Sequence, residues 1–227
     1  ESQRNGDFWI TGSQQFSLME NVTESLAGRV GILNMQGLSQ SEINCFDNQS
    51  PFTTNKEVSV FRDYDSTQLF KHILRGSYPA LYKNPDTDTE LFYSSYLQTY
   101  IERDVRQITA IGNLGAFVDF IKVIAARTGQ ILNYNDVAKD VGISVNTAKN
   151  WTRILECSGI VYLLHPWSNN VTNRTIKTPK IYFMDTGLCC YLTGWKDCQS
   201  LFSGMFSGAI LETYVISEII KSFIHNG

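Results

Sequence analysis

The stretch that decides the fold is residues 113–164, with the sequence NLGAFVDFIKVIAARTGQILNYNDVAKDVGISVNTAKNWTRILECSGIVYLL. Its opening part carries a regular series of apolar residues: Leu114, Phe117, Val118, Ile121, Ile124 and Ala125. Recurrence at i, i+3, i+4 and i+7 places such side chains on one face of a helix. The pattern therefore predicts one amphipathic helix whose apolar face packs into a core.

Two further helices are predicted within the same stretch. Residues 134–141 predict a short second helix that Gly142 ends, because glycine readily adopts the left-handed conformation found after helix termini. Ser144 is placed to cap a third helix, since its hydroxyl can accept a hydrogen bond from a free backbone N–H. The third helix carries apolar residues at Val145, Ala148, Trp151, Ile154 and Leu155, and it ends near Gly159.

Two strand-like segments come next, residues 160–164 and 180–184, with a polar segment between them. An antiparallel pair connected in this way forms a β-hairpin. Three helices followed by a hairpin is the order of a winged helix, a variant of the DNA-binding helix-turn-helix. The sequence therefore predicts a mainly α fold with minor β (α+β), with a winged helix in this region.

The charge distribution is consistent with a nucleic-acid-binding surface here. Residues 113–184 hold eight Lys or Arg and four Asp or Glu, a local net charge of +4, whereas the rest of the chain sums to −7. Lys and Arg bind DNA phosphates independently of sequence, with an affinity that falls as salt rises. The candidate DNA-binding residues are Asn146, Lys149, Asn150, Arg153, Arg174 and Lys177. The alternative is a solvated face on a winged helix that packs against protein.

The flanking sequence predicts one strand and several helices. Residues 30–35 predict a short buried strand, and Ser39 is placed to cap a helix that contains Glu42. Further helices are expected at residues 66–74, 89–108 and 210–224. The last of these carries a wide apolar stripe, which predicts burial on more than one side: Leu211, Val215, Ile216, Ile219, Ile220, Phe223 and Ile224.

The whole chain has 227 residues, of which 43% are hydrophobic, and a net charge of −3. This composition can fill a core, which excludes wholesale disorder and fibrous classes. The sequence contains no apolar run near the ~18 residues of a membrane span, and its amino end does not resemble a signal peptide. Five cysteines without CxxC spacing predict neither a disulfide framework nor a zinc module. We expect a cytoplasmic protein with no membrane partner.

Common catalytic motifs are missing from the sequence. No Gly directly precedes a Lys, so the phosphate-binding loop GxxxxGK[ST] is absent, and the three histidines are isolated. Residues 181–185 imitate a Walker B strand that ends in Asp185, which could bind magnesium or cap the helix starting near Gly187. We favour the cap. We expect the chain by itself not to be an enzyme and to hold no cofactor and no metal.

Several short motifs follow one another in a fixed order and span nearly the whole chain. They are FWITGSQQF (8–16), SLAGR (25–29), GLS (37–39), GSYPALY (76–82), TYIERDVR (99–106), ARTGQ (126–130), TPKIYFMDTGL (178–188) and GAILET (208–213). By these motifs the chain resembles the predicted prokaryotic AAA-type (AAA+ superfamily) ATPases that carry a C-terminal domain of unknown function. In that family the C-terminal region contains a winged helix and usually a restriction-endonuclease-like tail.

The resemblance implies a fragment that starts at the sensor-1 strand and divides into four parts. Residues 1–45 would be the C-terminal end of the AAA-type ATPase core, and residues 46–112 a loop and a helical lid or connector. Residues 113–188 would form the winged-helix domain. Residues 189–227 would be a linker and the first helix of a truncated restriction-endonuclease-like domain, with Glu212 or Glu218 at its acidic position.

The resemblance also implies positions that act on nucleotide. Thr11 and Ser13 would bind it, with Ser13 at the sensor-1 position, which helps place the attacking water; the alternative is an ordinary polar turn. Arg29 would be an arginine finger that reaches the nucleotide of a neighbouring subunit, or a cation that compensates the dipole of a helix end. The full-length parent is expected to be a homo-oligomeric ATPase that uses ATP and Mg²⁺.

The favoured function is that of the C-terminal part of an AAA-type ATPase, whose winged helix binds DNA or a partner under nucleotide control. In a first alternative the winged helix is a protein–protein scaffold for oligomer assembly with no DNA role, and Trp151 and Trp167 are buried at a contact. In a second alternative the full-length protein is a metal-dependent nuclease. The downstream carboxylates and lysine of such a nuclease are absent from this chain.

Overall fold

The three helices predicted in the deciding stretch form as expected. The structure, a computed structural model, describes residues 31, 33–45, 65–100, 113–167 and 178–225. Helix α7 spans Leu114–Ala126, α8 spans Tyr134–Val141 and α9 spans Val145–Cys157. The side chain of Asn113 caps α7, and Gly142 ends α8 in the left-handed conformation with φ of 77°. These local signals fix the helix ends, so the sequence alone locates them closely.

A small antiparallel sheet packs against these helices. Its strands are β1 (Gln130–Ile131), β2 (Val161–Leu164) and β3 (Lys180–Phe183), in the order β1-β3-β2. Leu163 pairs with Ile181 between β2 and β3, and Ile131 pairs with Lys180 between β1 and β3. The antiparallel pairing of β2 with β3 confirms the predicted strand pair, whereas the two-residue β1 was not predicted. The mainly helical fold with minor strand content is likewise as expected.

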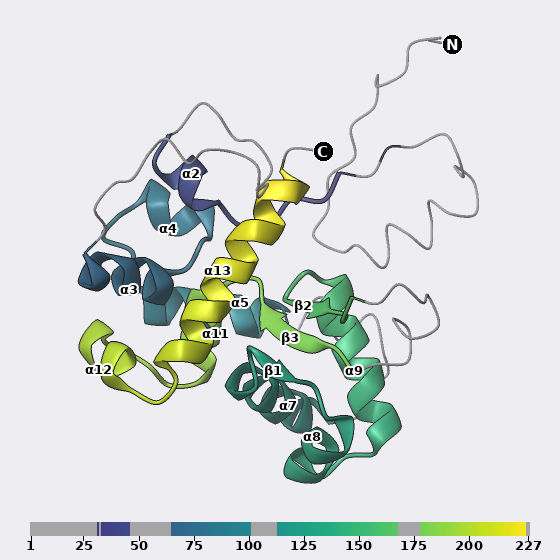
Figure 1. Ribbon diagram of the computed structural model, residues 1–227. Coiled ribbons are helices and arrows are strands. Elements are labelled where there is room, and N and C mark those ends of the chain that lie inside the picture. The colour runs from purple at the N-terminus through teal and green to yellow at the C-terminus, as the bar shows by residue number, and fades with distance from the viewer. Residues whose placement is uncertain (1–30, 32, 46–64, 101–112, 168–177, 226–227) are drawn as a thin grey trace, which may run out of the picture.

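The remaining helices form a second group on the other side of the molecule (Figure 1). They are α2 (Gln40–Ile43), α3 (Ser66–Arg75), α4 (Pro79–Lys83), α5 (Thr89–Tyr100), α11 (Thr186–Leu192), α12 (Cys198–Ser203) and α13 (Ser207–Ile224). The long helix α13 crosses between this group and the sheet, and it packs against β3, α3, α11 and α12. It therefore connects the two halves.

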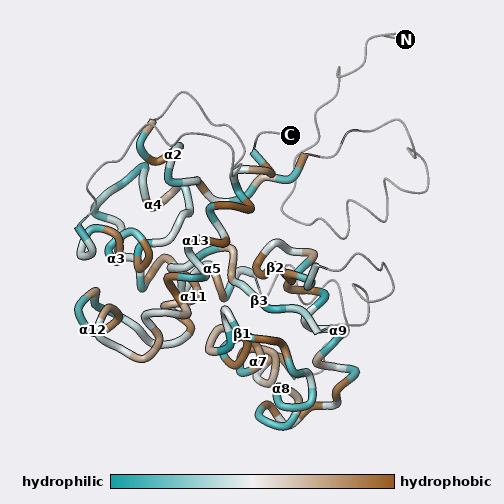
Figure 2. The backbone as a smooth tube through the Cα atoms, viewed as in Figure 1, coloured by the Kyte–Doolittle hydropathy of each residue, from teal (hydrophilic) through white to brown (hydrophobic). Residues whose placement is uncertain are grey.

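Helix α11 lies at the centre of one continuous core. It packs against α3 and α5 on one side and against α7 on the other. Leu188, Cys189 and Cys190 are at most 1% exposed, in the same cluster as Phe117 of α7 and Ile73 of α3. The tube of α7 is hydrophobic along most of its length (Figure 2). The five cysteines form no disulfide.

Two predictions about the flanking sequence differ from the structure. Among residues 31 and 33–35 no strand forms, and the side chains of Leu33 and Met35 are 77% and 90% exposed. A strand needs a paired neighbour, and no strand of the described sheet lies beside this segment. Residues 189–227, expected to be a linker and the first helix of a further domain, include the end of α11, all of α12 and α13. Of the expected helix 89–108, residues 89–100 form α5, and residues 101–108 lie outside the described residues.

The second difference concerns the polarity of α13, whose predicted apolar stripe is only partly buried. Val215 and Phe223 are 47% and 51% exposed, whereas Thr213, Ser217 and Lys221 are at most 2% exposed. The polar side chains thus face the protein interior. Among the described residues, no helix has the length and apolar character needed to cross a membrane.

Candidate functional site

Helix α9 is held in place by a cap at its start and an aromatic cluster beneath it. The Ser144 hydroxyl accepts a hydrogen bond of 3.0 Å from the N–H of Thr147. On the inner face, the ring of Trp151 meets Phe117 and Phe120 edge-on, with ring centroids 5.1 and 5.4 Å apart. Trp151 is 7% exposed. Because these contacts lie within the core of the chain, they fix which face of α9 points to solvent.

The outer face of α9 carries four of the predicted DNA-binding residues. Asn146, Lys149, Asn150 and Arg153 are all exposed. Their spacing of three, four and seven residues places them on one side of the helix. The structure thus brings these four together, whereas the predicted residues Arg174 and Lys177 lie outside the described residues.

The two cations of this face are not neutralised by carboxylates. Among the described residues neither Lys149 nor Arg153 makes an ion pair, in contrast to Arg127, which pairs with Asp140, and Lys180, which pairs with Glu212. The Lys149 ammonium lies 5.9 Å from the centre of the Tyr134 ring. An exposed contact of this kind contributes about 0.5–1 kcal/mol, so it leaves the ammonium available to an anion.

The nearest acid to this face is Glu156, one turn beyond Arg153. Burial raises the pKa of Glu156 above its ordinary value, although His165 and Arg153 act in the opposite direction. Burial, followed by Glu156, also raises the pKa of Tyr134. The face is therefore cationic and amide-rich, a combination that suits phosphate and base edges.

A second polar site is buried at the start of α11, around Asp185. Its carboxylate accepts hydrogen bonds from the Ser77 N–H (2.6 Å), the Ser77 hydroxyl (2.8 Å), the Tyr93 hydroxyl (2.8 Å) and the Leu188 N–H (2.6 Å). Asp185 is 6% exposed and is the N-cap of α11. The prediction that Asp185 caps a helix is confirmed. Four protein donors occupy its oxygens, which explains how a carboxylate can be buried here.

Two glycines allow the end of α3 and the start of α11 to approach each other closely beside Asp185. A Cβ atom on Gly76, whose φ is +81°, would lie 2.0 Å from the Tyr93 hydroxyl oxygen. A Cβ atom on Gly187 would lie 2.8 Å from the Arg75 carbonyl oxygen. Larger residues would therefore separate α3 from α11. The motifs GSYPALY (76–82) and TPKIYFMDTGL (178–188) contain Gly76, Ser77 and Gly187. No local pattern in the sequence connected these residues to Asp185.

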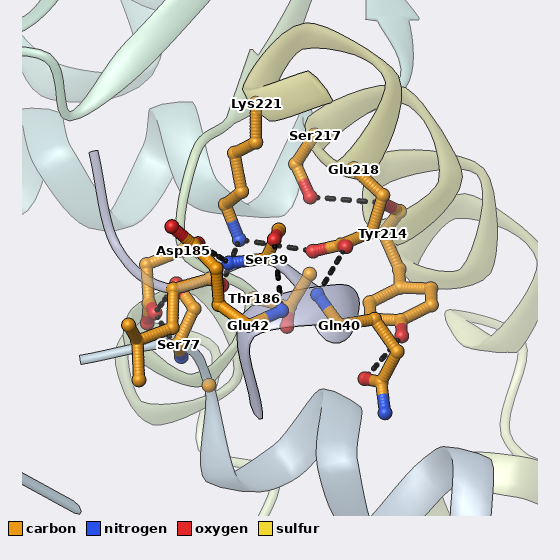
Figure 3. A network of polar contacts seen from close by, with 12 residues as sticks. Ser39, Gln40, Glu42, Ser77, Asp185, Thr186, Tyr214, Ser217, Glu218 and Lys221 are labelled. Atoms are coloured by element: carbon orange, nitrogen blue, oxygen red, sulfur yellow. Dashed lines mark hydrogen bonds and ion pairs between the residues drawn. The ribbon is translucent and has the colours of Figure 1, made fainter. Parts of the chain in front are cut away.

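A third polar cluster joins α2 to α13, and Figure 3 shows it beside Asp185. Lys221 is 2% exposed and donates to the Leu38 carbonyl oxygen (3.2 Å) and the Glu218 carboxylate (3.1 Å). The other Glu218 oxygen accepts the Gln40 N–H at 2.6 Å. The Tyr214 hydroxyl donates to the Gln40 side-chain oxygen at 2.8 Å.

The capping box of α2 completes this cluster. The Ser39 side chain accepts the Glu42 N–H, and the Glu42 carboxylate accepts the Ser39 N–H at 2.7 Å, which confirms Ser39 as the predicted cap. His225 Nδ1 lies 3.0 Å from Glu42 Oε2, within ion-pair distance for a protonated imidazole but outside hydrogen-bond geometry. Burial opposes ionisation of Glu42, but the Ser39 donors and His225 together hold its pKa below the ordinary value.

The carboxylates implied for a nuclease-like helix are engaged by protein groups. Glu212 accepts hydrogen bonds from the Lys180 ammonium (2.8 Å) and the Tyr182 hydroxyl (2.6 Å), and Glu218 binds Gln40 and Lys221. In the part of the chain that the structure describes, no group of three His, Cys, Asp or Glu side chains could hold a metal ion. Thr11, Ser13 and Arg29, the positions implied for nucleotide, lie outside the described residues.

Sequence reasoning missed Lys221 and its partners. A lysine among the apolar residues of α13 was the available signal, since Lys is almost never buried unless it is paired. Its partner Glu218 lies three residues away on the same helix, but Leu38 is separated from it by 183 residues. No local pattern can reveal such a contact.

Comparison with known proteins places the chain among uncharacterized relatives. Residues 1–44 match the AAA domain, and residues 66–199 match a family described as Domain of unknown function (DUF8612). An uncharacterized protein of Mycobacterium bovis and one of Mycobacterium tuberculosis are each 27% identical over 213 residues, which cover 93% of this chain. The chain spans 44% of the length of each of these relatives. No solved structure matches it.

The match to residues 66–199 takes in helices α3 to α9, the whole sheet, α11 and the Asp185 site. It covers more than half of the chain, and the AAA-domain match precedes it. The chain therefore belongs to the DUF8612 family and carries an AAA-type segment at its amino end.

Proposed function

We propose that this chain is the C-terminal part of an AAA-type ATPase and that its region 113–188 is a winged helix that binds duplex DNA through α9. The observation that carries the proposal is the outer face of α9, where two cations that make no ion pair with any described residue lie beside two asparagines. The three helices and the antiparallel pair β2–β3 have the element order of a winged helix.

The chemistry of the face suits a helix in the major groove. An α-helix fits that groove, where Asn can bind adenine through two hydrogen bonds and Lys or Arg can reach phosphates or guanine. Asn146 and Asn150 would then face base edges, and Lys149 and Arg153 would supply phosphate contacts. Trp151 belongs to the core beneath α9, so the aromatic packing would hold the helix rigid while its outer face binds.

The same proposal includes an ATPase activity for the whole protein. The AAA-domain match at residues 1–44 supports a longer ATPase that uses ATP and Mg²⁺ and forms a homo-oligomer, with nucleotide controlling the winged helix. Thr11, Ser13 and Arg29 would act on the nucleotide there. The chain by itself is proposed to have no enzymatic activity, and a cytoplasmic location follows from the same proposal.

The test compares two charge-matched double variants in binding to a labelled duplex. Lys149→Gln/Arg153→Gln removes the two cations of α9, and Lys83→Gln/Lys122→Gln removes two exposed lysines of α4 and α7. At about 50 mM salt the α9 variant should bind at least about tenfold more weakly, while the control stays within about twofold. The slope of log affinity against log salt should fall by about 2 in the α9 variant, since each lost phosphate contact removes about 0.9.

Two outcomes would overturn the proposal. One is undetectable binding of the unaltered chain to duplex DNA at low salt. The other is equal loss of affinity in the α9 variant and its control, because a merely non-specific charge effect would not distinguish the two surfaces. Asn150→Ala adds a separate measurement, since it should change the preference among duplex sequences more than the salt slope.

A protein-binding role is the second candidate, and exposed apolar side chains favour it. Trp167 is 77% exposed and Phe223 is 51% exposed. The scaffold alternative, in which α9 packs against protein, would use such surfaces, although Trp151 already packs inside this chain. A stable oligomer that does not bind DNA would support the scaffold. A nuclease activity of the longer protein would require residues beyond those of this chain.

A further inference from the structure

The segment that ends the AAA-domain match makes a series of polar contacts with the rest of the molecule. We call residues 38–44 the strap: it includes the Ser39 cap and helix α2. All seven residues are described, and none of the four side chains of α2 is buried. A segment of this size would usually be held by apolar burial, at roughly 25 cal/mol per Å². The apolar residues of the strap, Leu38 and Ile43, are only partly buried and lie outside the core cluster.

The contacts of the strap reach two separate parts of the chain. Its Leu38 N–H donates to the Ser77 carbonyl oxygen at 2.7 Å, next to the Asp185 site. Three more of its contacts lie on α13: the Leu38 carbonyl oxygen with Lys221, the Gln40 N–H with Glu218, and the Gln40 side chain with Tyr214. The strap therefore bridges the family domain and the helix that follows it.

Lys221 has the central position in these contacts. Its ammonium is buried, and it binds a strap carbonyl and the same Glu218 that accepts a strap N–H (Figure 3). A cavity of about 10 Å³ lies beneath the strap, lined in part by Leu38, Tyr214 and Lys221. A space of this size begins to admit one water molecule. Water can thus replace protein partners one at a time if the strap lifts.

We propose that the strap is a releasable clasp between the AAA-type segment and α13, with Lys221 as the residue that positions it. Release would break these hydrogen bonds and leave the apolar core around α11 and α7 closed, because no strap residue belongs to that core. Movement of the AAA-type segment could thereby be transmitted to α13. The proposal does not depend on whether α9 binds DNA.

Native-state hydrogen exchange measured by mass spectrometry tests this proposal. In the unaltered chain, amides of residues 38–44 should exchange through a local opening that is nearly independent of denaturant, while amides of α7 and α11 exchange only through global unfolding. Lys221→Met should speed exchange in the strap by about tenfold or more, the effect of losing a charged buried hydrogen-bond donor, with α7 little changed.

The chain offers a matched control and a milder variant. Lys122 also pairs with an acid three residues earlier on its helix, Asp119 at 3.8 Å, but its side chain is 53% exposed. Lys122→Met should leave strap exchange unchanged. Tyr214→Phe removes one strap contact without removing a charge, and it should speed strap exchange by a few-fold even if Lys221→Met does not fold.

The proposal fails if strap amides of the unaltered chain exchange as slowly as those of α11 and respond to denaturant in the same way. It also fails if Tyr214→Phe and every folded Lys221 variant leave strap exchange unchanged relative to α7. Equal acceleration across the whole chain would show general destabilisation and would likewise overturn a separate clasp. A selective increase in residues 38–44 supports it.

Discussion

Helices α9 and α13 present opposite kinds of surface to the core. Helix α9 buries Trp151 and Leu155 and exposes amides and cations, whereas α13 buries Thr213, Ser217 and Lys221 and leaves Val215 half exposed. In Figure 2, hydrophobic stretches of α13 alternate with hydrophilic ones along its length. The difference teaches that helix amphipathicity identifies the buried face only where the neighbours are apolar.

The neighbours explain the difference. Beneath α9 lie aromatic rings of α7, which offer no hydrogen-bond partners, so mainly apolar side chains pack there. The buried hydroxyl of Thr152 donates to the Ala148 carbonyl oxygen of its own helix. Beneath α13 lie the strap, Thr128 and the strand β3, which present backbone and hydroxyl groups. Polar residues of α13 are therefore buried with partners, as buried polar groups require.

The largest loss of stability is expected from the buried apolar face of α9. Trp151→Ala removes the ring that packs against Phe117 and Phe120 and leaves a cavity, which should lower the free energy of unfolding by about 3–5 kcal/mol. Urea denaturation followed by circular dichroism measures the loss. Trp167→Ala is the matched control, because this ring is 77% exposed and should cost no more than about 0.5 kcal/mol. Equal losses would mean that Trp151 is not a core residue.

A smaller loss is expected on the inner face of α13. The Thr213 hydroxyl is buried, donates to the Ala209 carbonyl oxygen and lies 2.8 Å from the Thr128 hydroxyl, which also accepts the Phe183 N–H. Thr213→Val keeps the shape and removes the hydroxyl, so it should lower the free energy of unfolding by about 1–2 kcal/mol.

The outer face of α13 supplies the control for Thr213→Val. Val215→Thr makes the reverse change at a position that is 47% exposed, and it should alter stability by no more than about 0.5 kcal/mol. The same denaturation experiment measures both. If Thr213→Val stabilised the chain, the polar interior of α13 would not contribute to stability and the comparison with α9 would lose its physical basis.

Helices α9 and α13 also differ in how their first turns are capped, and the expected effect on the free energy of unfolding is smaller. Ser144 caps α9 through its hydroxyl, whereas Phe206 at the start of α13 makes no side-chain cap. Ser144→Ala should therefore lower the free energy of unfolding by about 1 kcal/mol. Ser207→Ala, in the first turn of α13, should have an effect within about 0.5 kcal/mol. Thermal unfolding of the two variants side by side measures the difference, and equal shifts would refute a specific capping role.

The parts of the fold that could be predicted from sequence are those set by local chemistry. Ser39, Ser144 and Gly142 act within four residues of their own helices, and Asp185 caps the helix that follows it directly. The apolar period of α7 was likewise sufficient to locate its buried face. Such signals need no knowledge of the rest of the fold.

The parts that could not be predicted depend on distant partners. The strap meets α13 across 183 residues, and Ser77 meets Asp185 across 108. The prediction of a buried strand at residues 30–35 was wrong because short apolar runs do not specify whether a paired neighbour exists. The four α9 residues were found because exposure follows directly from helix periodicity once Trp151 and Leu155 are assigned to the core.

The smallest effect concerns the surface pair that joins the polar side of α13 to the sheet. Hydrogen bonds from Lys180 and then Tyr182 hold the pKa of Glu212 below its ordinary value of 4.5, although burial acts in the opposite direction. A depressed pKa in the folded state adds stability above the ordinary pKa, and this stability is lost as pH falls through the folded-state value. The side chains of Lys180 and Glu212 are 42% and 43% exposed, so solvent screening keeps the contribution below about 1 kcal/mol.

Glu212→Gln should therefore be slightly less stable than the unaltered chain at pH 7, and the difference should disappear well below pH 4.5. Denaturation at a series of pH values measures it, and the difference between the two chains cancels the titration of other carboxylates. Glu90→Gln is the control. Glu90 pairs with Lys196 and is more exposed than Glu212, so this variant measures the general effect of losing a surface carboxylate. A Glu212→Gln difference that persists unchanged into acid would mean that packing of the side chain, rather than its charge, attaches α13 to β3.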